Sequence, residues 1–95
     1  MIQQAIQEIL QSIPKDHLFD SHFVINELIR KHSDEYLRFA NSFNHTGLTT
    51  EIFHGHIAQE IANFEGTLAS RKQKPMSWSH NIHGECSECS CWQKI

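Results

Sequence analysis

Histidine and cysteine are concentrated near the C-terminus, in the stretch HNIHGECSECSCW over residues 80–92. Zinc prefers four nitrogen or sulfur ligands in a tetrahedron, and two cysteines separated by two residues often supply half of such a site. Cys86 and Cys89 have this spacing. The candidate metal ligands are therefore His80, His83, Cys86, Cys89 and Cys91.

The same cysteines also fit a β-strand that uses them as small apolar residues. Residues two apart in a strand share a face, so Cys89, Cys91 and Gln93 would lie on one face and Trp92 on the other. Free cysteine is often buried, and on this interpretation Cys89 and Cys91 face the helices. A second Cys-x-x-Cys pair is missing from the sequence. We therefore expect no bound cofactor and keep zinc as the alternative.

Catalytic chemistry has little support in the sequence. His83 and Cys86 could form a base and a nucleophile, as in enzymes that use a thiolate. No third group stands out to orient the histidine, and the chain has no phosphate-binding glycine loop and no clear acid–base pair of carboxylates. We therefore expect a protein that is not an enzyme.

Length and composition indicate one small folded domain. Ninety-five residues suffice for a single core, and 39% hydrophobic with 20% charged residues is the composition of an ordinary globular protein. No apolar run approaches the roughly 20 residues that span a bilayer, and the opening stretch lacks the features of a signal peptide. We therefore expect a cytoplasmic protein without a membrane partner, which its three cysteines also suit.

The spacing of apolar residues predicts that most of the chain is helical. Ile2, Ile6 and Ile9 share one face of a helix that Pro14 ends. The expected fold class is α+β, with about four helices followed by a C-terminal two-stranded β-hairpin. Residues 1–95 form one domain, with an N-terminal amphipathic helix over 1–13, a helical core over 20–66 and the hairpin over 67–95.

Within the hairpin, alternating residues predict strands over 67–73 and 85–95. The histidines and a proline lie between them, in an expected loop over 74–84. This loop and the start of the second strand hold most of the candidate metal ligands.

The order of these elements resembles the winged helix-turn-helix domain. Residues 34–43 correspond to the first helix of its motif, residues 51–65 to the recognition helix and residues 67–95 to the wing, so the resemblance covers roughly residues 20–95. It implies duplex DNA as a partner, with the recognition helix in the major groove. One fold serves many functions, however, so the case for DNA binding depends on which side chains the recognition helix and the wing carry.

Those residues give DNA binding mixed support. Gln59 and Asn63 could contact base edges, and the basic residues Arg71, Lys72 and Lys74 could contact phosphates. The expected recognition helix has no lysine or arginine and carries three carboxylates, which a polyanion repels. Lysine also commonly protects the edge of a hairpin from pairing with another chain. Two histidines of this helix, His54 and His56, could instead complete a zinc site.

Charge favours a protein partner. Residues 1–65 hold four basic and nine acidic groups, a net −5, and residues 66–95 hold four basic and two acidic groups, a net +2. The candidate interface residues are Glu51 and Glu60 on the acidic helices and Trp78 in the hairpin, because tryptophan is a favoured interface anchor.

The expected function is therefore that of a small non-enzymatic regulatory or adaptor domain. It would bind a protein or a second copy of itself through the acidic helical face or the Trp-bearing hairpin. A DNA-binding winged-helix regulator is the alternative, and a zinc-stabilised binding module is a lesser one.

Overall fold

The structure is a computed structural model of the 95-residue chain. It describes residues 2–42, 50–80 and 86–95, with side chains over 2–42, 52–71 and 91–95. In chain order the elements are α1 (Ile2–Ser12), β1 (Leu18–Asp20), α2 (Ser21–Lys31), α3 (Ser33–Ser42), α4 (Thr50–Ala62), β2 (Ala69–His80) and β3 (Cys86–Lys94). The α+β, mainly helical fold class is confirmed.

In the part of the chain that the structure describes, the sheet has three strands, so the expectation of a two-stranded sheet is wrong. Its strands run antiparallel in the order β1-β3-β2. The backbone of His17 accepts a hydrogen bond from Lys94 N at 2.9 Å, and Asp16 N donates to Lys94 O at 2.8 Å, just before β1 pairs with β3. The sequence missed β1 because three residues are too few to show an alternating pattern, and the strand exists only through this long-range pairing.

β2 is longer than expected. It runs through Pro75 to His80, across residues that were expected to form a loop. Its pairing with β3 shifts register between Lys72 and Ser77, which marks an irregularity in the ladder. Proline is tolerated on edge strands and at bulges because it has no N–H to donate, and β2 is an edge strand.

Both α1 and α4 bury an apolar stripe at helical spacing. On α1 its residues are Ile2, Ala5, Ile6, Ile9 and Leu10. On α4 they are Phe53, Ile57 and Ile61. Asp20 caps α2, because its Oδ1 accepts a hydrogen bond from Phe23 N at 2.8 Å. α4 ends at Ala62, and the chain then turns through Gly66, whose φ is +87°.

Trp92 corrects the expected orientation of β3. It is 1% exposed and is the largest fully buried side chain among the described residues, whereas Cys91 is half-buried on the opposite face. Trp92, and not the cysteine beside it, therefore faces the helices. A large aromatic ring buries more apolar area than a thiol does, so the core takes the tryptophan.

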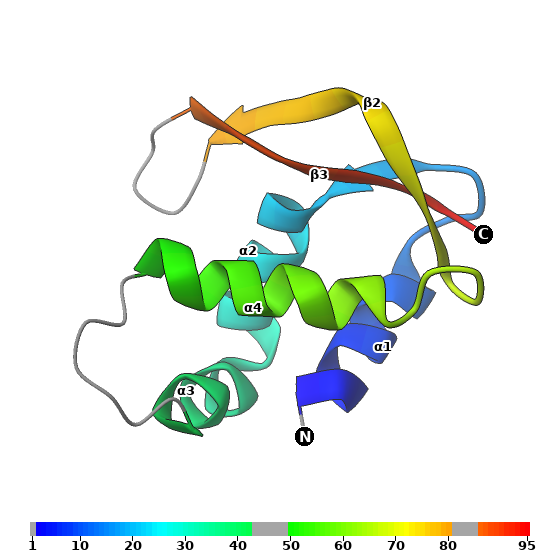
Figure 1. The fold of residues 1–95 in the computed structure, drawn as a ribbon. Coiled ribbons are helices and arrows are strands. Elements are labelled where there is room, and N and C mark those ends of the chain that lie inside the picture. The colour runs from blue at the N-terminus through cyan, green and yellow to red at the C-terminus, as the bar shows by residue number, and fades with distance from the viewer. Residues whose placement is uncertain (1, 43–49, 81–85) are drawn as a thin grey trace.

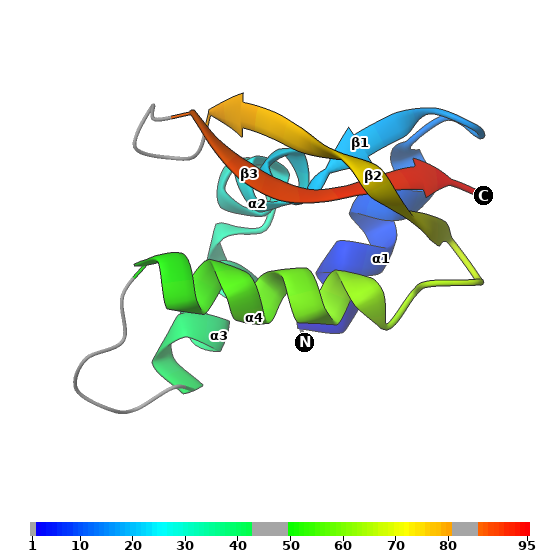
Figure 2. The ribbon, with the colours of Figure 1, turned by 45° about the horizontal axis from the view of Figure 1, so that its top comes forward.

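The sheet and the helices form two layers. In Figures 1 and 2 the strands lie on one side of the molecule and the helices on the other, with α4 running beneath the hairpin. The start of α4 and the arrowhead end of β2 lie at the same end of the molecule, on the left in both views. None of the helices, as far as the structure describes them, is long and apolar enough to cross a membrane.

Candidate functional site

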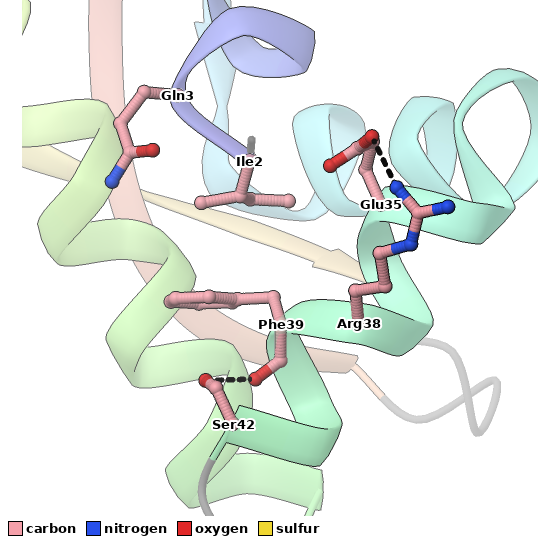
Figure 3. Close-up of a pocket in the computed structure, with 6 residues that line it drawn as sticks. All are labelled: Ile2, Gln3, Glu35, Arg38, Phe39 and Ser42. Carbon is pink, nitrogen blue, oxygen red and sulfur yellow. Dashed lines mark hydrogen bonds and ion pairs between the residues drawn. The ribbon is translucent and has the colours of Figure 1, made fainter.

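A cleft of about 490 Å³ opens between the start of α1 and one face of α3. Figure 3 shows Ile2 above the ring of Phe39, with Gln3 on one side and the charged pair on the other. The lining is mostly apolar, with polar groups at the margin. The lining residues are Ile2, Gln3, Glu35, Arg38, Phe39 and Ser42.

Helical spacing explains why α3 presents these side chains together. Residues three and four apart share a helix face, and Glu35, Arg38, Phe39 and Ser42 follow that spacing. Ser42 Oγ donates to the carbonyl of Phe39 at 2.6 Å, which keeps this hydroxyl against its own helix. One wall of the cleft is therefore a single face of α3.

The margin of the cleft carries both signs of charge. Arg38 donates to Glu35 at 3.3 Å, and the Arg38 side chain remains 74% exposed while that of Glu35 is 25% exposed. On the opposite side, Gln3 Nε2 donates to Glu60 Oε2 on α4 at 3.1 Å. Asn63 Nδ2 donates to the same oxygen at 3.1 Å. The α1 side of the cleft is thus tied to α4.

An aromatic cluster holds α3 against α4. Tyr36 Oη and His54 Nε2 are hydrogen-bonded at 2.9 Å, and the ring of Tyr36 meets that of Phe53 edge-on with centroids 5.2 Å apart. Phe39 reaches the same ring, with centroids 5.6 Å apart. Burial raises the pKa of Tyr36 above its ordinary value. The cluster fixes the position of Phe39, which forms part of the cleft.

α3 itself is shallowly packed. None of its residues is buried, and Leu37, which lies off the apolar stripe of this helix, is 57% exposed. Sequence reasoning missed the cleft, because Ile2 and Phe39 both belong to regular apolar stripes that predict a closed core. The exposed apolar residue of α3, Leu37, gave no signal for the cleft, because its spacing places it on the other side of the helix from Arg38, Phe39 and Ser42.

The residues proposed for DNA contact are spread over two elements. Gln59 is exposed on α4 and Asn63 is exposed directly after the helix ends, where the amide of Asn63 is bonded to Glu60. The guanidinium of Arg71 lies over the ring of Trp92, 5.6 Å from its centroid. The side chains of Lys72 and Lys74 lie outside the described residues.

The register of the β2–β3 hairpin shows which strand residues each candidate metal ligand is paired with. The backbone of His80 pairs with Cys86, and that of Cys89 pairs with Ser77. Cys91 pairs with Asp20 on one side and with Lys72 on the other. His83 lies outside the described residues. Among the side chains that the structure describes, no three His, Cys, Asp or Glu gather in a metal-binding group.

Of the proposed interface residues, Glu60 is the one whose side chain the structure describes. Glu60 is half-buried and accepts hydrogen bonds from Gln3 and Asn63, so it belongs to the α1–α4 contact. The side chains of Glu51 and Trp78 lie outside the described residues; the backbone of Trp78 pairs with Glu88.

No family model, curated protein or solved structure matches this chain. The function is therefore argued from the residues and the geometry alone.

Proposed function

We propose that this domain is a non-enzymatic adaptor that binds a protein partner at the cleft between α1 and α3, on a scaffold resembling a winged helix. The observation that carries the proposal is an open, mostly apolar cleft of about 490 Å³ whose margin holds both a carboxylate and a guanidinium. Clefts of this size with few polar groups are typical of binding sites.

The chemistry of the cleft suits an apolar side chain of a partner. Ile2 and Phe39 provide apolar surface, and burying that surface stabilises a complex by about 25 cal/mol per Å². Arg38 at the margin can pair with a carboxylate beside that anchor, because its side chain is 74% exposed. A central apolar contact with a polar rim is the usual anatomy of a protein interface.

DNA binding is the second candidate, and the topology favours it. A helix, α4, is followed directly by an antiparallel hairpin, and the sheet order is β1-β3-β2. That arrangement is similar to the recognition helix and wing of a winged helix-turn-helix domain. The residues favour it less, since α4 contains no lysine or arginine and Asn63 is bonded to a carboxylate.

The experiment that tests the proposal places a photo-reactive amino acid at Ser42, in the cleft, and at Gln11, on the exposed face of α1. A partner cross-linked from Ser42 and not from Gln11 is then purified, and its affinity is measured by calorimetry. Ser42→Trp should fill the cleft and weaken binding by at least about tenfold, which corresponds to about 1.4 kcal/mol. Gln11→Trp, the matched control, should leave the affinity unchanged.

Two results would contradict the proposal. In the first, Ser42→Trp binds the purified partner as tightly as the original chain. In the second, the domain binds duplex DNA at about 50 mM salt and loses most of that affinity by about 200 mM, as phosphate-contacting proteins do. Fluorescence anisotropy with a labelled duplex measures this DNA affinity directly. Such a salt dependence would favour DNA binding by α4 and the hairpin over protein binding at the cleft.

A further inference from the structure

α3 is the helix that contributes no buried residue to the core. By contrast, α1 buries five of its eleven residues and α2 buries four of its eleven. In Figures 1 and 2, α3 lies beyond α4, on the side away from the strands. Segments with few buried apolar contacts open locally at a lower free energy than the core does. α3 therefore has the features of a segment that opens while the other helices stay folded.

Two aromatic side chains attach α3 to α4. Tyr36 Oη is hydrogen-bonded to His54 Nε2 at 2.9 Å, and the ring centroids of Tyr36 and Phe53 are 5.2 Å apart. The ring of Phe39 reaches the same phenylalanine, with centroids 5.6 Å apart. Phe53 is 5% exposed. These contacts are made by half-buried residues at the surface, and they are lost together if α3 leaves α4.

A single residue, His32, separates α2 from α3. Its backbone N–H donates to Leu28 O at 2.8 Å and so belongs to α2, whereas its carbonyl accepts from Tyr36 N at 3.0 Å and so begins α3. The ring of His32 contacts α1, because its Nε2 lies 3.4 Å from Glu8 Oε2. His32 is thus held by α1 and α2, and residues at the ends of elements commonly serve as hinges. The boundary of an opening unit would fall at this residue.

We propose that α3 opens as a unit at His32, and that its docking on α1 and α4 makes and unmakes the α1–α3 cleft. The inference rests on the proposed function of that cleft. Phe39 and Ser42 are on α3 and Ile2 is on α1, so opening removes one wall of the cleft. Ten residues are too few to keep a detached helix stable in water. A partner bound in the cleft would hold α3 in place, because a ligand stabilises the state that it binds.

The test is native-state amide hydrogen exchange of the full chain, followed by NMR. Each amide reports the opening that exposes it. Amides of residues 37–42 in α3 should be at least about tenfold less protected than those of residues 25–31 in α2. The amide of His32 should exchange with α2 and that of Tyr36 with α3, because their acceptors lie on opposite sides of the boundary. If the amides of α3 are protected as strongly as those of α2, the proposal is wrong.

Two variants separate local from global opening. Ile61 is fully buried in the last turn of α4, at the opposite end from Phe53 and His54. Ile61→Val should speed exchange in α2 by about two- to tenfold and leave exchange in α3 unchanged, since only global unfolding exposes Ile61. Tyr36→Phe should speed exchange in both helices, because its bond to His54 is lost in either opening.

Equal acceleration of α2 and α3 by Ile61→Val would overturn the proposal, because α3 would then open only when the whole domain unfolds. Exchange is measured without a partner, so this result is separate from the effect of Ser42→Trp on binding. A cleft that binds its partner on a helix that never opens alone would retain the proposed function and refute the opening of α3.

Discussion

Replacing Trp92 tests which face of β3 packs on the helices. Trp92 is 1% exposed, pairs with Phe19 on one side and lies under the guanidinium of Arg71 on the other. Burying a tryptophan removes about 200 Å² from water, which is worth up to about 5 kcal/mol at 25 cal/mol per Å². Among the described residues no group accepts a hydrogen bond from its buried Nε1, and an unpaired buried N–H costs about 1–3 kcal/mol.

Trp92→Ala should therefore destabilise the domain by about 3 kcal/mol or more, within the range found for large aromatic residues in cores. For a domain of this size the melting temperature should fall by at least about 12 °C. Trp92→Phe removes the unpaired N–H together with part of the ring, so its cost should be less than half as large. Urea unfolding followed by circular dichroism measures all three proteins.

Cys91→Ala is the matched control on the opposite face of the strand. Cys91 is half-buried and small, so its replacement should cost less than about 1 kcal/mol. If Cys91→Ala proved more destabilising than Trp92→Ala, β3 would present its cysteines to the helices, and the register described above would be refuted.

Three further predictions concern the backbone and the contact between α3 and α4. Asp20→Ala should cost about 1 kcal/mol in urea unfolding, because it removes the cap of α2, whereas Asp20→Asn should cost a few tenths. Gly66→Ala should destabilise the domain by about 1–2 kcal/mol, because φ is +87° there. Gly55→Ala, at an exposed position within α4, should instead stabilise it by up to about 1 kcal/mol. Melting temperatures that shift in the same direction for both variants would contradict this pair of predictions. Tyr36→Phe should cost about 0.5–1.5 kcal/mol at neutral pH by removing the bond to His54. Burial raises the folded-state pKa of Tyr36, so its contribution is present below the unfolded value of 10.0 and is lost as the pH rises through the folded value. Tyr36 is the single tyrosine of the sequence, so its phenolate absorbance can be followed alone. This absorbance should appear at a higher pH in the folded chain than in the chain unfolded in urea. An identical titration in both states would show that the Tyr36 hydroxyl is not buried.

Local patterns were a good guide wherever a segment interacts mainly with itself. The stripe of Ile6, Ile9 and Leu10 predicted α1 and its buried face, because a helix forms its hydrogen bonds within four residues. The extended segment from residue 86 onward was also predicted, from alternation alone.

Features that depend on distant partners were missed or reversed. β1 has only three residues, and it is a strand because β3 lies beside it. The alternation of β3 indicated two faces but could not say which one faces inward, since both Cys91 and Trp92 are plausible core residues. The cleft between α1 and α3 exists only because two helices far apart in the chain diverge over Ile2 and Phe39.

The sequence by itself therefore determined the helices and the presence of a C-terminal hairpin, because each depends on hydrogen bonds and side-chain spacing within a few residues. It also determined which residues could bind a metal or a partner, since that is a matter of side-chain chemistry. Only the tertiary structure decided the third strand, the inward face of β3, the pairing of His80 with Cys86 and the position of the cleft. Each of these depends on the packing of segments that are distant along the chain, and the largest side chain takes the most buried place that this packing offers.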